Sequence, residues 1–96
     1  MLVLDKAIEQ AKALPAVYVI VGDQNKYRYK GSCRNLRKRL SDHRAGRVSR
    51  TKNRRPLNVV FFEYCKTYTE ARRLENFLKT GAGRKYIVKA GLNQDT

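Results

Sequence analysis

The apolar residues follow two spacings, one typical of helices and one typical of strands, and the two alternate along the chain. Near the N-terminus, Leu4, Ile8 and Ala11 recur at the spacing of one helical face, and Pro15 cannot continue a helix. We therefore expect a short helix over residues 5–13.

A β-hairpin is expected next. Residues 16–21 are apolar and largely β-branched, and they end at a glycine. The polar residues 23–26 have the composition of a turn, and an alternating pattern resumes over residues 27–31. Leu36 and Leu40, spaced i and i+4, then predict a second helix over 34–45.

The residues that follow mark the two ends of that helix. They are succeeded by a loop and then by a strand. Asn35 or Ser32 can cap its start, and Gly46 should end it. Residues 47–56 are polar and basic without apolar periodicity, as in a loop with room for one helical turn. Residues 57–65 hold an unbroken apolar run, which is typical of a strand covered on both faces and predicts the central strand of the sheet.

Thr67 and Glu70 have the spacing of a capping box, in which both side chains accept backbone N–H groups at the start of a helix. The apolar stripe of this helix consists of Ala71, Leu74, Phe77 and Leu78. The helix should end near Thr80, with Gly81 as a left-handed C-cap.

A last short helix is predicted over residues 84–90, ending at Gly91. The order of elements indicates an α+β fold, with a small three-stranded antiparallel sheet flanked by helices. The length fits a single domain with one core. Its parts are an N-terminal helix, a core and a tail, over residues 1–14, 15–90 and 91–96 of a domain spanning 1–96.

The net charge is the feature of the sequence that says most about the partner of the protein. The 22 Lys and Arg against 8 acidic residues give a net charge of +14, which implies a polyanionic partner. Nucleic acid is the leading candidate, because phosphate contacts release counterions. An anionic membrane surface fits less well, since no basic amphipathic helix with bulky apolar anchors is present.

The sequence also indicates where in the cell the protein is found. No segment is apolar enough to cross a membrane, and residues 1–14 lack the features of a secretory signal. We expect a cytoplasmic protein, nucleoid-associated in a prokaryote. Cys33 and Cys65 have no metal-ligand spacing and are interpreted as small hydrophobes.

Tyr18 and Tyr29 lie on the two strands of the predicted hairpin, and a loop with an even number of residues places both rings on one face. A two-residue loop at Asp23-Gln24 would put the tyrosines directly opposite each other. A four-residue loop would make them diagonal neighbours. From these residues alone, a pair that only stabilises the sheet is an equal alternative to a functional pair.

Charged and titratable side chains that could take part in catalysis lie on the two longer predicted helices. Arg39 and His43 are four residues apart and are therefore neighbours on the helix surface, a pairing that does not by itself indicate a catalyst. Phosphodiester cleavage usually recruits a divalent metal ion, which needs carboxylate ligands. The positions of Glu70 and Glu75 on the helical wheel do not show which of these two carboxylates is the better candidate ligand.

These elements together resemble the GIY-YIG nuclease family in order and spacing. The likeness spans roughly residues 14–87; its start is similar to excision-repair nuclease subunits, and residues 79–84 look like the short standalone members. The positions that carry it are Tyr18, Tyr29, Gly31, Ser32, Asn35, Leu36, Arg39, Leu40, His43 and the run from Glu70 to Glu75.

The resemblance implies a metal-dependent endonuclease. Tyr18 and Tyr29 would line its cleft, with Tyr18 assigned to deprotonate or orient the attacking water. Arg39 would hold the scissile phosphate, and His43 would assist proton transfer or position a tyrosine. Glu75, selected by the resemblance and not by the helix, would bind one Mg²⁺ or Mn²⁺.

Two motifs depart from the family pattern. Ala16-Val17-Tyr18 replaces G-I-Y, and Tyr29-Lys30-Gly31 replaces Y-I-G, so both tyrosines are retained. Lys30 should point away from the Tyr29 face, toward an exposed surface or a phosphate. Some members carry a lysine just after the second glycine, and Lys38 is the candidate replacement for that charge here.

Cations around this site are expected to hold the nucleic-acid backbone without reading sequence. They are Lys30, Arg34, Arg37, Lys38, Arg47, Arg50, Lys52, Arg54, Arg55 and Arg84. We expect DNA in preference to RNA, structure-selective or weakly specific nicking, no membrane partner, no organic cofactor, and a monomer or weak homodimer. The alternative is a non-catalytic DNA- or RNA-binding module derived from the same fold.

Overall fold

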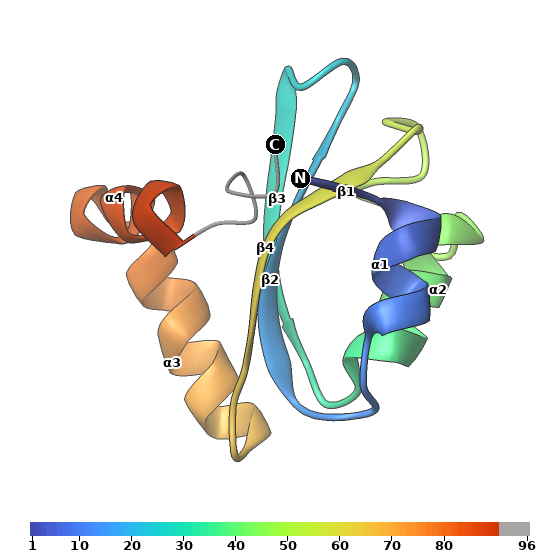
Figure 1. The fold of residues 1–96 in the computed structure, drawn as a ribbon. Helices are drawn as coiled ribbons and strands as arrows, with labels where there is room; N and C mark the ends of the chain where they lie inside the picture. Colours follow the sequence, from blue (N-terminus) through green and yellow to red (C-terminus); the bar gives the residue numbers. More distant parts are fainter. Residues whose placement is uncertain (91–96) are drawn as a thin grey trace.

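The computed structural model describes residues 1–90, so Gly91 and the tail expected over 91–96 lie outside the described residues. Four strands form one antiparallel sheet in the order β1-β4-β2-β3 (Figure 1). They are β1 (Leu2–Val3), β2 (Ala16–Gly22), β3 (Tyr27–Cys33) and β4 (Asn58–Tyr64). The α+β class is confirmed. The sheet has one strand more than expected, because the two residues of β1 are too few to show alternation.

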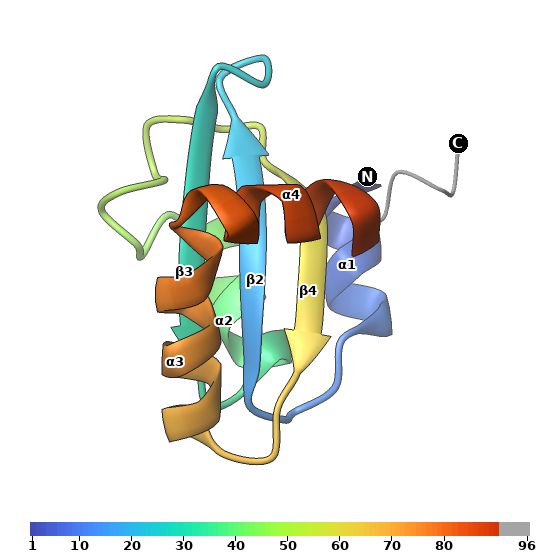
Figure 2. The same cartoon turned by 90° about the vertical axis from the view of Figure 1, so that its left-hand side faces the viewer.

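Two helices cover each face of the sheet (Figures 1 and 2). On one face lie α1 (Leu4–Gln10) and α2 (Leu36–Arg44), and on the other lie α3 (Tyr68–Leu78) and α4 (Gly81–Ala90). None of the helices within residues 1–90 combines the length and the apolar character that a membrane span requires.

The start and end of α2 follow the local signals in the sequence. The Asn35 side chain accepts a hydrogen bond from the Lys38 backbone N–H at 3.0 Å, so Asn35 and not Ser32 caps the helix. Gly46 adopts a left-handed φ of 78° just after the helix end, as expected.

The most buried strand is β2, every residue of which is buried. Its even-numbered side chains pack toward α1 and α2, and its odd-numbered side chains pack toward α3 and α4. β4, expected as the central strand, is one of the two inner strands, and it lies between β2 and the two residues of β1. A bulge opposite Val19 and Ile20 puts Val60 and Phe61 into the same cluster, which explains the unbroken apolar run.

The start of α3 is close to the expected capping box. The Thr67 hydroxyl accepts the Glu70 backbone N–H at 3.1 Å, as predicted. The Glu70 carboxylate, however, accepts from the N–H of Lys66 at 3.4 Å and not from that of Thr67. One half of the box is therefore formed as expected, and the other is shifted by one residue.

The junction of α3 and α4 differs from the prediction. Gly81 is not a left-handed C-cap, because α3 ends at Leu78 and α4 already begins at Gly81. The Thr80 hydroxyl accepts the backbone N–H of Gly83 at 3.0 Å and so caps α4. Gly83 lies against the end of α3, where an added Cβ would be 2.0 Å from the Phe77 carbonyl oxygen.

We predict that Gly83→Ala destabilises the fold by about 2 kcal/mol or more, because the new methyl group meets backbone that cannot move without displacing α3. Gly81→Ala is the matched control: an added Cβ there has no neighbour within 4 Å. It should be neutral or stabilising by up to about 1 kcal/mol. Urea unfolding of both variants measures the difference, and equal stabilities would contradict the close packing of α3 on α4.

Candidate active site at the edge of β3

The hairpin brings Tyr18 and Tyr29 together as diagonal neighbours. Residues 23–26 form a four-residue turn in which the first three have left-handed φ values of 52°, 57° and 70°. Tyr18 therefore pairs with Gly31, and Tyr29 pairs with Ile20. The two rings share one face, with their centroids 6.2 Å apart. The four-residue alternative is the one that the structure adopts.

Gly31 makes room for the Tyr18 ring. A Cβ added at Gly31 would lie 2.6 Å from the Tyr18 hydroxyl oxygen and 2.9 Å from the Tyr29 ring. The glycine of the Y-x-G motif is thus needed for close packing, because any larger residue would push the two tyrosines out of place.

His43 joins the tyrosines from α2. It is fully buried, and its ring centroid lies 5.4 Å from those of both Tyr18 and Tyr29. Its Nε2 is 2.8 Å from the Tyr18 hydroxyl, and its Nδ1 is 2.7 Å from the Thr51 hydroxyl. Thr51 is also fully buried and donates to the Val48 carbonyl at 3.4 Å. We assign the tautomer from this chain: Nδ1–H donates to Thr51, and Nε2 accepts from Tyr18.

Burial keeps both His43 and Tyr18 neutral. It lowers the pKa of His43 to about 4, with the charge of Arg39 as the next cause. Burial also raises the pKa of Tyr18 well above 10; nearby Tyr29 adds to that rise, and Arg39 opposes it. Tyr18 is fully buried and resists ionisation, so it is poorly suited to the water-activating role assigned from the sequence. Tyr29 is partly exposed.

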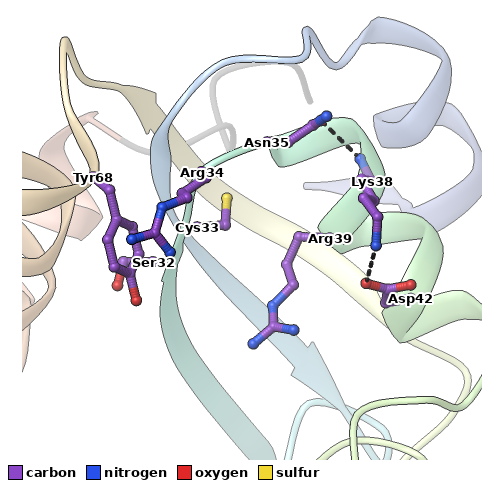
Figure 3. A pocket seen from close by; sticks show the side chains of 8 residues that line it. All are labelled: Ser32, Cys33, Arg34, Asn35, Lys38, Arg39, Asp42 and Tyr68. Carbon is purple, nitrogen blue, oxygen red and sulfur yellow. Dashed lines mark hydrogen bonds and ion pairs between the residues drawn. The ribbon is translucent and has the colours of Figure 1, made fainter.

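Arg39 projects from α2 into an open pocket of about 340 Å³ (Figure 3). Its positive charge is close enough to act on both Tyr18 and Tyr29. Across the pocket, the Arg34 guanidinium lies over the Tyr68 ring, 4.2 Å from its centroid. The pocket therefore offers an anion two guanidinium groups next to the tyrosine pair.

Lys38, the candidate replacement for the charge that the family places after the second motif, lines the same pocket as Arg39. Its ammonium group lies 3.7 Å from a carboxylate oxygen of Asp42, and Figure 3 shows it directed away from the Arg39 guanidinium. Its role as the replacement charge stays a prediction.

Glu75 approaches β3 from the opposite face of the sheet. One carboxylate oxygen accepts from the Ser32 hydroxyl at 2.6 Å, and the other lies 2.9 Å from the Lys79 ammonium. Burial raises the pKa of Glu75, but the hydrogen bonds from Ser32 and Lys79 outweigh it and hold the pKa below its usual value. Glu75 is therefore ionised and tied to β3, whereas Glu70 is exposed and serves as a cap.

The predicted cations divide into four groups. Arg47, Arg54 and Arg55 bond to Asp42, to Asp23 and to backbone carbonyls, and so hold the loop in place. Arg34 and Lys38 line the pocket of Arg39. Lys30, Arg50 and Arg84 lie near the other face of β3, while Arg37 and Lys52 are simply exposed.

Some contributing residues were not identified from the sequence. Thr51 lies in a loop whose composition gives no signal of burial. Ser32 was noted only as a motif position and a candidate helix cap, although strand alternation places it on the face opposite Gly31. Lys79 follows Glu75 by four residues, which is the favourable order for a helical ion pair and was a usable signal.

One comparison with known proteins identifies the family of the chain. The family model of the GIY-YIG catalytic domain matches residues 14–86, so the chain belongs to the GIY-YIG family. Members are generally endonucleases, which makes this a nuclease-type domain with nucleic acid as its class of substrate. Searches of curated proteins and of solved structures found no significant match.

GIY-YIG nucleases typically depend on a divalent metal ion. Within residues 1–90 no group of three or more His, Cys, Asp or Glu side chains is placed to hold one. The donors at Glu75 and Ser32 are nevertheless oxygen atoms, and Mg²⁺ is often bound by one carboxylate together with waters and substrate phosphate. The Lys79 ammonium shows that this carboxylate accommodates a cation.

We predict that His43 makes the stability of the fold depend on pH. Between pH 6.5 and 4 the unfolded chain binds a proton at His43 and the folded chain does not, so acidification destabilises the fold. The loss from this group is on the order of 3 kcal/mol. Urea unfolding from pH 7 to 4 should show this slope in the wild type and a shallower one in His43→Gln. Identical slopes would contradict a buried, neutral histidine.

Proposed function

We propose that the chain is a divalent-metal-dependent endonuclease that hydrolyses phosphodiester bonds in DNA, as a structure-selective or weakly specific nicking enzyme. The observation that carries this proposal is the meeting of two halves at the edge of β3. Tyr29 and Arg39 lie on one side, and ionised Glu75, bonded to Ser32, lies on the other.

In this reading Arg39 binds the scissile phosphate and neutralises its charge. Its guanidinium group is half-buried, so its attraction for an anion is less screened than that of a cation in bulk water. Glu75, with the Ser32 hydroxyl beside it, holds Mg²⁺ or Mn²⁺. When bound, the ion supplies Lewis-acid stabilisation of the leaving oxygen.

Tyr29 takes the role of orienting the attacking water, and its phenolate form is the one that accepts the proton of that water. It is partly exposed, and the positive charge of Arg39 acts on it. Tyr18 and His43 are positioning residues, because both ring nitrogens of His43 are engaged and both side chains are fully buried. Their packing against Tyr29 fixes the direction of its ring.

We also propose how the enzyme is organised and which nucleic acid it acts on. A single domain over residues 1–96 acts without an organic cofactor, as a monomer or weak homodimer in the cytoplasm. DNA is preferred to RNA as the substrate. Arg34 and the cations beside β3 contact the backbone, so specificity comes from the shape of the nucleic acid and not from its sequence.

We predict that Glu75→Gln reduces metal-dependent nicking of supercoiled plasmid by about 100-fold or more, because the amide cannot hold the ion. Glu70→Gln, on the same helix, is the matched control and should cleave like the wild type, since its side-chain oxygen still accepts at the cap. Both proteins should retain most of their DNA affinity. A wild type that cleaves no plasmid or flap substrate with Mg²⁺ or Mn²⁺ would leave only the non-catalytic binding module.

We predict a similar contrast between two tyrosines of β3. Tyr29→Phe should lower the cleavage rate by about 100-fold or more, because the proton acceptor is lost. Tyr27→Phe keeps its ring under the Arg54 guanidinium and should retain the wild-type rate. Single-turnover cleavage at saturating protein compares the chemical step in the two variants. Equal rates would remove Tyr29 from the mechanism.

A further inference from the structure

Four cations gather on the α3 and α4 face of β3. Arg28 and Lys30 alternate along the strand and so share this face, and Lys79 and Arg84 reach it from the two helices. Among residues 1–90 only Lys79 of these four has a carboxylate partner, Glu75. Within the described residues, three positive charges are thus held together without an acidic partner.

This arrangement has a cost to the folded protein. Lys30 is partly buried, and its pKa is lowered by that burial and by the charges of Arg84, Arg28 and Lys79. Repulsion among these groups opposes folding, and nothing in the packing of β3 requires a lysine at position 30. Strand positions of this kind commonly carry a β-branched or aromatic residue.

The cations also border a hollow. Arg28, Lys30 and Lys79 line an open pocket of about 280 Å³ at the edge of β3, together with Arg50 from the loop and the rings of Tyr27 and Tyr29. Tyr29 therefore borders this hollow and is also close enough to the Arg39 guanidinium for its charge to act on it. An anion in the hollow would lie next to the proposed site of cleavage.

We propose that the cluster of Arg28, Lys30, Lys79 and Arg84 binds a backbone phosphate that flanks the scissile one, so that the nucleic-acid strand crosses the edge of β3. This inference rests on the proposed function only in taking a nucleic acid as the ligand. Lys79 belongs to both sites, since its ammonium already bonds to Glu75 and also borders the hollow. A cation at Glu75 would release Lys79 toward the phosphate.

The test measures binding of a fluorescein-labelled DNA duplex in EDTA, where no cleavage occurs, over a series of salt concentrations. The change is Lys30→Met, which keeps the aliphatic stem and removes the charge. Loss of one phosphate contact should reduce the slope of log Kobs against log salt by about 0.9 and weaken binding severalfold at low salt. The thermal midpoint of the free protein should rise, because repulsion is relieved.

Lys6→Met is the matched control, since it removes one charge from an exposed residue of α1 on the far side of the sheet. It should leave the salt slope unchanged. A wild-type slope in Lys30→Met, or a fall in both affinity and thermal midpoint, would overturn the phosphate site. If the wild type binds DNA but never cuts it, the proposed nuclease function is wrong and the proposed phosphate site is unaffected. The two proposals can therefore fail separately.

Discussion

The buried hydrogen-bond chain from Tyr18 through His43 to Thr51 is the interaction on which the site depends. It links β2, α2 and the loop that follows α2. Because a buried polar group without a partner costs about 1–3 kcal/mol, each member fixes the position of the next. The chain also requires a neutral histidine and a neutral tyrosine, and burial provides both. Its role is therefore to hold the site in shape.

The edge of β3 explains how groups on opposite faces of a sheet can serve one reaction. Neighbouring strand residues point to opposite faces, so Gly31 admits the tyrosine pair while Ser32 reaches Glu75 on the other side. In the middle of the sheet these groups would be separated by backbone. At an edge strand, a ligand can lie across the rim and contact both. Exposed edges invite unwanted pairing with other strands, and Arg28 and Lys30 of β3 oppose that as well.

Local signals were sufficient for much of the fold, and long-range packing decided the rest. The hairpin and α2 followed from turn composition, the i, i+4 leucines and a cap at Asn35. β1 is too short to leave a pattern, and the bulge in β4 accounts for its unbroken apolar run. The site shows the same division: alternation placed both tyrosines on one face, but only packing shows that Tyr18 is buried. Likewise, Glu75 differs from Glu70 through its contact with Ser32, a residue 43 positions away along the chain.

The distribution of the few acidic residues explains where the excess positive charge acts. With 8 acids for 22 Lys and Arg, most cations cannot be paired. Asp5, Asp23 and Asp42 each pair with arginines outside β3, and these pairs steady the loop and the end of α2. At β3 itself the only acid in an ion pair, among residues 1–90, is Glu75, and its partner is Lys79. Arg28, Lys30 and Arg84 therefore place positive charge near the carboxylate that is proposed to hold a metal ion. A phosphate backbone drawn there by the cations would meet the site without any contact to its bases.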